Sequence, residues 1–193
     1  MSDATKEVLH RYLARTREAV IWKTEGLSEY DVRRPITRTG TNLLGLVKHL
    51  AIGEAWYFGG VFGRPFEPHL PWWDDDAPEG VDLWATESER RADILDTYRA
   101  ATAHADDTIA ALDLSAPGQV PWWPRPETTL QAVLVHVLAE TARHAGHADI
   151  LREQLDGSTG FRADNLNQEP HDDDWWADFR ARIESAARAA ATG

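Results

Sequence analysis

Two residues spaced four apart, Glu140 and His144, are the part of the sequence best suited to chemistry. The segment around them, about 128–155, carries apolar residues at three- and four-residue intervals, which predicts an amphipathic helix. Both side chains fall within the apolar stripe of that helix, beside Val133 and Leu151. A bare carboxylate buried there would be costly. Because a divalent metal would offset this charge and use the adjacent imidazole, the pair is a candidate half-site for metal.

A third ligand, His49, is predicted on a second helix. It lies in a segment of about 42–62 that is hydrophobic almost all round, so its imidazole is expected to be buried. His49 is about as far from the end of its helix as Glu140 and His144 are from the start of theirs. If the two helices run antiparallel, the three side chains lie at the same level and can bind one metal ion.

Simpler interpretations of the same residues stay open. Glu140 and His144 can share a hydrogen bond in a satisfied core, or the stripe can be wet at one edge. His49 can be a core histidine that donates to a backbone carbonyl. Convergence of all three side chains is what would favour a metal over these alternatives.

Three more side chains are candidates for the surroundings of the site. His136 and His147 flank the apolar stripe at one edge, so each is expected to hydrogen-bond a metal ligand, to serve as acid or base beside it, or to lie in an interface. We favour a hydrogen bond to a metal ligand or a position in an interface. Trp56, on the helix of His49, is a pocket candidate. Glu54 on that helix either orients a ligand or pairs with an arginine, and we assign it no role.

The elements that must position these residues are helices. Apolar periodicity predicts four of them, over about 3–26, 42–62, 86–112 and 128–155. A fifth is predicted over about 172–191, where an acidic start and later arginines suit the helix macrodipole. Stretches rich in Pro, Gly and polar residues predict three connections, at 27–40, 63–85 and 113–127. No strand pattern competes. We therefore predict a single all-α domain over 1–193, with a bundle core at about 3–157 and a C-terminal helical extension at about 172–191.

The predicted helix ends rest on capping residues. Thr41 is expected to cap the second helix, and Thr86 followed by Glu89 has the spacing of a capping box for the third. Thr128 or Thr129 is expected to cap the fourth, which should stop at Asp156-Gly157.

The connection at 63–85 is unusually long for a link between helices, and it contains four prolines and three consecutive aspartates. A crossover along the bundle explains its length. The second and third helices then run parallel and the fourth runs antiparallel to the second, which is an up-down-down-up four-helix bundle. This topology also puts Trp72-Trp73 and Trp122-Trp123 at the same end of the bundle, where they either stack on a ligand or simply cover the core.

The composition restricts the partners. A net charge of −12 without a cluster of basic residues disfavours nucleic acid and anionic lipid. The N-terminal segment is charged and periodic, and no run is long enough to span a membrane, so we expect a cytoplasmic protein. A homodimer is compatible with the sequence. The 17 arginines against 3 lysines are typical of a GC-rich, actinobacterial source.

The runs around the proposed ligands resemble a known family. They are Val-Lys-His49-Leu-Ala-Ile-Gly-Glu-Ala-Trp-Tyr and Glu140-Thr-Ala-Arg-His144-Ala-Gly-His-Ala-Asp. Over about residues 5–157 the sequence is similar to the DinB/YfiT-like superfamily, specifically to the metal-binding domain of mycothiol-dependent maleylpyruvate isomerase. The resemblance implies an up-down-down-up bundle with a metal on His49, Glu140 and His144. It does not imply maleylpyruvate as substrate, because the isomerase has a further C-terminal domain that contributes to its site.

The sequence therefore favours a metal-dependent thiol S-transferase that acts on an unknown electrophile. Three protein ligands would leave a position open on the metal, as in catalytic sites, and a coordinated thiol is easily deprotonated. The chain has no cysteine, so the thiol must come from outside, and the resemblance implies mycothiol. Zinc is the expected metal, with nickel, iron or manganese as alternatives.

Two alternative functions stay open. The runner-up is a non-catalytic metal-binding stress-response bundle. A di-iron carboxylate bundle ranks third, because it needs two Glu-x-x-His motifs and only Glu7 and His10 have that spacing.

Overall fold

The structure, a computed structural model, describes residues 3–74 and 76–191, and most of them are helical. The α-helices are α1 (Asp3–Trp22), α2 (Glu29–Arg33), α3 (Leu43–Tyr57), α4 (Arg91–Ala111), α5 (Leu130–Asp156) and α6 (Asp173–Ala191). The 3₁₀ helices are η1 (Gly60–Phe62), η2 (Pro71–Trp73) and η3 (Val81–Leu83). Two short strands, β1 (Pro117–Gln119) and β2 (Glu127–Thr129), complete the list. The all-α prediction is confirmed.

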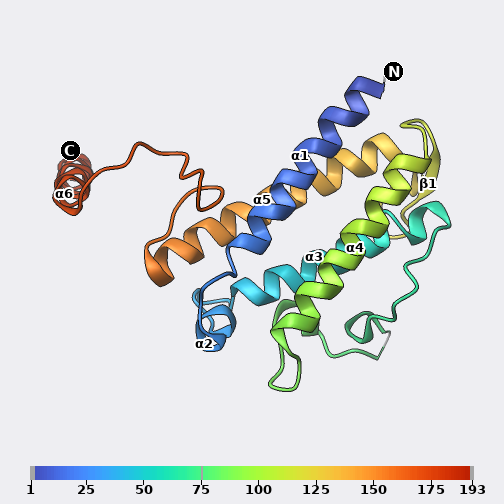
Figure 1. Ribbon diagram of the computed structural model, residues 1–193, viewed down its shortest axis with the longest axis horizontal. Coiled ribbons are helices and arrows are strands. Elements are labelled where there is room, and N and C mark those ends of the chain that lie inside the picture. Colours follow the sequence, from blue (N-terminus) through green and yellow to red (C-terminus); the bar gives the residue numbers. More distant parts are fainter. Residues whose placement is uncertain (1–2, 75, 192–193) are drawn as a thin grey trace. The chain divides into compact units, whose positions relative to one another are not determined.

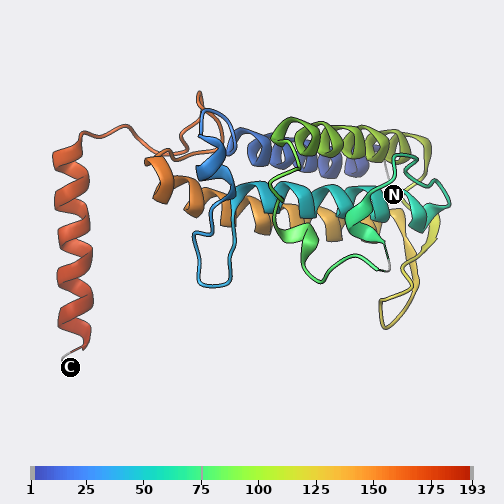
Figure 2. The ribbon, with the colours of Figure 1, turned by 90° about the horizontal axis from the view of Figure 1, so that it is seen from below.

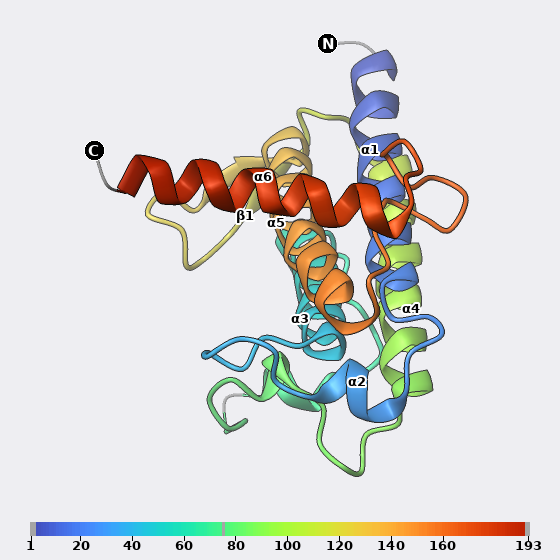
Figure 3. The same cartoon turned by 90° about the vertical axis from the view of Figure 1, so that its left-hand side faces the viewer.

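Four helices, α1, α3, α4 and α5, lie side by side and enclose the core (Figure 1). Helix α3 packs against α4 and α5, and α1 packs against α5. The chain between α3 and α4 runs back along the bundle, so these two helices run in the same direction (Figure 2). Figure 3 views the bundle along its length, with α1 beside α4 and α3 beside α5. Helices α3 and α5 therefore face each other along the side that carries the candidate ligands.

Helix α5 begins and ends where its local signals predict. The Thr129 hydroxyl accepts the amide of Ala132 as N-cap, and Gly157 adopts the left-handed conformation that commonly follows a helix. Helix α3 differs from the prediction at both ends. Its N-cap is Asn42, whose side chain accepts the Gly45 amide at 2.8 Å, and not Thr41.

Helix α3 also ends at Tyr57 and not at Phe62. The chain bends at Gly59, where any side chain would overlap the Ala55 carbonyl, and continues as η1. The predicted helix from 42 to 62 is therefore two elements separated by a glycine bend.

Helix α4 starts later than the capping pair suggests. The Thr86 amide donates to the Glu89 carboxylate at 2.7 Å, so half of the predicted capping box forms. It forms within a turn, however, and the helix begins only at Arg91. Glu89 also pairs with the buried Lys48 of α3 at 2.7 Å, and we attribute the delayed start to this tertiary contact.

Each of the three predicted connections contains short elements that were missed. The stretch from 27 to 40 contains α2, capped by Ser28. The stretch from 63 to 85 contains the 3₁₀ helices η2 and η3. The stretch from 113 to 127 contains an antiparallel hairpin in which β1 pairs with β2, so the prediction that no strand occurs was wrong. All these elements are three to five residues long, too short for periodicity to reveal.

The core consists of contiguous apolar clusters between the four helices. One cluster lies where the hairpin covers the bundle and includes Leu13, Phe58, Ile109 and Leu134. Another lies around Tyr98 and reaches the helices α1, α3, α4 and α5. These clusters hold α3 and α5 in a fixed register, which positions the side chains of the site.

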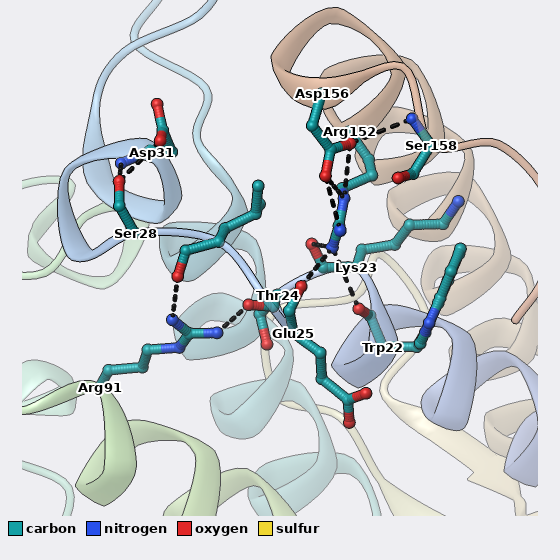
Figure 4. A network of polar contacts seen from close by, with 11 residues as sticks. Trp22, Lys23, Thr24, Glu25, Ser28, Asp31, Arg91, Arg152, Asp156 and Ser158 are labelled. Carbon is teal, nitrogen blue, oxygen red and sulfur yellow. Dashed lines mark hydrogen bonds and ion pairs between the residues drawn. The ribbon is translucent and has the colours of Figure 1, made fainter. Parts of the chain in front are cut away.

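A buried arginine ties the end of α1 to α5 (Figure 4). Arg152 donates to three carbonyls at and just after the end of α1, those of Trp22 (3.4 Å), Lys23 (3.1 Å) and Glu25 (2.7 Å). Arg152 also pairs with Asp156 at 2.8 Å, and the hydrogen bond that it donates to this carboxylate lowers the pKa of Asp156. A cation thus satisfies carbonyl groups at a helix C-terminus that would otherwise lack partners.

Replacing Arg152 by methionine is expected to lower the free energy of unfolding by about 2–4 kcal/mol, because several charge-assisted hydrogen bonds are lost at a buried position. Urea denaturation measures the change. Arg143, exposed on the same helix, is the matched control, and Arg143→Met should shift stability by less than about 0.5 kcal/mol. Equal stability of both variants would contradict the role given to Arg152.

The described residues from Gly160 onward form a separate compact unit. The predicted C-terminal helix forms as α6, which starts one residue later than expected. At its start, Trp175 stacks on Phe179 and on His171, which precedes the helix, with ring centroids 5.0 Å and 3.7 Å from that of Trp175. None of the helices in the described ranges carries an apolar stretch long enough to cross a membrane.

Candidate metal centre

A cavity of about 330 Å³ opens between α3 and α5. Its polar side is formed by His49 of α3 and by Glu140, Thr141 and His144 of α5. Its remaining walls are formed by Leu50, Ile52, Gly53, Glu54, Trp56, Tyr57, Trp73, Trp122, His136 and Val137. The three predicted metal ligands thus line one cavity, which we call the reaction cavity.

The two imidazoles of the predicted site are neighbours. The ring centroids of His49 and His144 are 5.2 Å apart. Two imidazoles on one tetrahedral zinc, with Zn–N bonds of about 2.0–2.1 Å, have centroids about 5 Å apart. The spacing of this pair therefore suits a shared ion.

His144 has the environment of a neutral imidazole. Burial lowers its pKa, and the neighbouring His49 and His147 act in the same direction. Its Nδ1 is buried and has no hydrogen-bond partner among the described residues. A neutral imidazole is the form that binds a metal, so the lowered pKa fits a ligand.

Glu140 fits the third ligand position less well than the two histidines fit theirs. Its Oε2 lies 3.8 Å from Nε2 of His144, near the 3.3–3.5 Å or so that separates two donors on a tetrahedral ion. Its side chain is 47 % exposed, however. In the described part of the chain, no three His, Asp or Glu side chains lie close enough together to hold an ion as they stand. The imidazole pair and the Glu140–His144 pair each fit a metal, and Glu140 is the outermost of the three donors.

His49 is oriented by a carboxylate that the sequence did not single out. Its Nδ1 lies 2.7 Å from Oδ2 of Asp82, in η3 of the crossover. Metal-binding histidines commonly donate their second ring nitrogen to a carboxylate, which leaves the other nitrogen free to bind the ion. Asp82 is one of several acidic residues between 74 and 89, and nothing in its local sequence distinguishes it.

The crossover is held firmly where it supplies Asp82. The Asn42 side chain donates to the carbonyl of Leu83 at 3.2 Å, and the buried Lys48 donates to that of Val81 at 2.7 Å. Gly45 allows the close approach, since any side chain there would overlap the Leu83 carbonyl. These contacts fix η3 on α3 and thereby fix the partner of His49.

The other candidate residues differ in position. Trp56 and His136 line the reaction cavity, and Nε2 of His136 lies 3.1 Å from the hydroxyl of Tyr57. His147 is exposed and is not among the lining residues, although its ring centroid is 5.5 Å from that of His144. His136 is therefore placed to act on a ligand in the cavity, whereas His147 lies beside it.

Glu54, on the cavity wall, forms a buried salt bridge. Arg17 of α1 donates to both of its carboxylate oxygens, at 2.7 Å and 2.6 Å. Arg17 also donates to Asp106, which in turn contacts His10. Burial raises the pKa of Glu54, and the Arg17 guanidinium opposes that effect. Of the two roles considered for Glu54, the structure shows the salt bridge with an arginine.

Aromatic rings form the outer wall of the reaction cavity. Trp56 contacts Trp73 of η2 and Trp122 of the hairpin, with centroids 5.5 Å and 5.2 Å apart. The two Trp pairs were expected at the same end of the bundle, and one member of each pair, Trp73 and Trp122, contacts Trp56 there. The other members pack elsewhere: Trp72 under Nζ of Lys48, and Trp123 against His136.

A family model described as mycothiol S-transferase matches residues 8–157. This match includes α3, α4 and α5, most of α1, and every residue of the reaction cavity. The chain belongs to the mycothiol S-transferase family. Membership in this family supports transferase activity with mycothiol as the thiol, and it agrees with the resemblance seen in the sequence. No curated protein matches the chain.

Proposed function

We propose that this protein transfers mycothiol to an electrophile in the reaction cavity, with a divalent metal held by His49, Glu140 and His144. The observation that carries the proposal is the pair of imidazoles 5.2 Å apart in the wall of one cavity. Family membership supports the identity of the thiol. Because the chain has no cysteine, the reacting sulfur comes from the substrate.

The reaction forms a bond between the thiol sulfur and a carbon of the electrophile. The S–H proton is released, and the leaving group departs with the electron pair of its bond to carbon. A bound divalent metal would supply the positive charge that lowers the pKa of the thiol, which is about 8.5 when free. Zinc suits two nitrogens and one carboxylate best, with nickel, iron and manganese as alternatives.

The chain's own residues supply position and environment. Asp82 orients the imidazole of His49, and burial keeps His144 neutral. Trp56, Trp73 and Trp122 form an aromatic wall along one side of the cavity. His136, bonded to Tyr57, is the nearest candidate to accept the released proton from the cavity.

Thiol consumption tests the proposed function. Zinc-loaded protein is mixed with mycothiol and 1-chloro-2,4-dinitrobenzene, and with a panel of alkylating electrophiles, and conjugates are measured by mass spectrometry. We expect conjugation with at least one electrophile to exceed the uncatalysed rate by at least about tenfold, to stop after chelation, and to return with zinc. Equal rates with and without protein across the panel would refute transfer and leave a metal-binding protein without catalysis.

A further inference from the structure

Helix α6, in the C-terminal unit, carries an apolar stripe along one side. No residue of this helix is buried, and only Trp175 and Trp176 are even half-buried. At 100° per residue, six side chains fall within about 100° of the helix surface. We call them the α6 stripe: Trp175, Trp176, Phe179, Ile183, Ala186 and Ala190. An exposed stripe of this kind is typical of a surface that packs against a partner.

The α6 stripe is bulky near the start of the helix and small near its end. If two α6 helices pack in antiparallel orientation and cross at Ala181, residues equally distant from 181 lie opposite each other. Trp176 then faces Ala186 of the second copy, and Phe179 faces Ile183. A parallel pair would instead set tryptophan against tryptophan and alanine against alanine, which crowds one end and leaves the other loosely packed. The sizes of the side chains therefore favour antiparallel packing of the stripe against itself.

The charged residues beside the α6 stripe also suit self-association. Asp178 and Arg182 lie along one edge, and Arg180 and Glu184 lie along the other. In an antiparallel pair of identical helices, each edge faces the same edge of the second copy. Each edge then holds two arginines and two acids, so its charges sum to zero. Glu184 pairs with Arg188 of its own helix at 2.7 Å, and a carboxylate has room to accept a second guanidinium.

A lipid surface is a poorer occupant for the same stripe. Helices that lie on anionic membranes are rich in lysine and arginine on their polar face. Helix α6 has four acidic residues and three arginines, and Asp173 and Asp174 stand beside its tryptophans. Its net charge is therefore negative, as is that of the whole chain. A second copy of α6 matches the stripe in both size and charge, whereas an anionic membrane matches only its apolar part.

We propose that α6 is a self-association surface through which two copies of this chain pair in antiparallel orientation, with the two-fold axis near Ala181. Such an interface is isologous, so the same stripe serves both copies. The residues that form it all belong to the C-terminal unit, outside the reaction cavity. The proposal therefore does not depend on the proposed function.

Sedimentation equilibrium of the full chain tests the surface. We expect a monomer–dimer equilibrium whose dissociation constant rises at least about a hundredfold in Phe179→Glu/Ile183→Glu, because pairing would bury two unpaired charges. The matched control is Ala181→Glu/Ser185→Glu, which adds the same two charges on the opposite face of α6. Its dissociation constant should stay within about threefold of wild type. Circular dichroism verifies that each variant keeps its helix content.

Spin labels test the orientation, since the chain has no cysteine and accepts a single engineered one. The labels are attached in Ala181→Cys and, separately, in Arg188→Cys. In an antiparallel pair, the two labels at 188 are separated by about 21 Å along the helix axis and those at 181 by almost none. Pulsed electron paramagnetic resonance is therefore expected to give a longer distance at 188 than at 181. A parallel pair gives equal distances at both positions.

Three results would overturn the proposal. One is a wild-type protein that stays monomeric up to the highest concentration, whether its stripe packs on its own bundle or binds phosphatidylglycerol vesicles in a cosedimentation assay. Another is a dimer that Phe179→Glu/Ile183→Glu leaves as stable as the control. The last is a pair of equal label distances at 181 and 188.

Discussion

Replacing His144 by alanine is expected to lower the affinity for zinc by more than about a hundredfold, since even the loss of a residue that only orients a ligand costs about 10–100-fold. The same substitution should abolish thiol transfer. Loss of His144 should lower zinc affinity more than loss of His49, because His144 is the more buried, with 17 % of its side chain exposed against 41 % for His49. Competition with a chromogenic chelator measures the affinity.

The control for this substitution removes an imidazole elsewhere. His171→Ala, in the C-terminal unit, should leave the zinc affinity within about twofold of wild type. His147→Ala is informative as well: a small loss would agree with its exposed position, whereas a loss as large as that of His144→Ala would make it a ligand. Unchanged zinc affinity in His144→Ala would remove His144 from the metal centre.

Replacing Asp82 by asparagine is expected to lower zinc affinity about 10–100-fold. The carboxylate accepts a hydrogen bond from Nδ1 of His49 and so selects the tautomer whose Nε2 carries the lone pair. An amide of the same size keeps the contact but loses the charge and the preference for one tautomer. Nitrogen-15 NMR of the metal-free protein reports that tautomer directly, so the effect can be seen without measuring activity.

The matched control for Asp82 is another crossover aspartate. Asp76 is exposed, and Asp76→Asn should leave the zinc affinity and the His49 tautomer unchanged. Gly45→Ala offers an independent test, because it displaces the segment that carries Asp82 without changing either partner of the hydrogen bond. If Asp82→Asn binds zinc as tightly as wild type, the hydrogen bond contributes nothing to the site.

Helices with strong local signals could be predicted closely. Helix α5 has a threonine cap, an apolar stripe and a terminal glycine, and it forms between Leu130 and Asp156 as its sequence indicates. The start of α4 could not be predicted from Thr86 and Glu89, because Glu89 is also held by a lysine from another helix. Local spacing predicts a cap, but contacts that are distant in sequence decide whether the helix begins there.

The same limit applies to the candidate site. The positions of His49, Glu140 and His144 follow from helical period and from the register of two antiparallel helices, and the three side chains do line one cavity. The expected burial of His49 and Glu140 was wrong, because both lie near the mouth of that cavity, with 41 % and 47 % of their side chains exposed. Asp82 could not be found in this way. It belongs to an irregular segment whose path is set by contacts with Asn42 and Lys48, and periodicity carries no information about such a segment.

X-ray absorption at the zinc edge tests the central claim most directly, since it counts the imidazoles around the metal. Protein loaded with one equivalent of zinc is predicted to show two imidazole neighbours and oxygen donors at about 2.0–2.1 Å. His49→Ala and His144→Ala should each remove one imidazole. A wild-type protein that binds no zinc, or an imidazole count that neither substitution changes, would contradict a metal centre between α3 and α5.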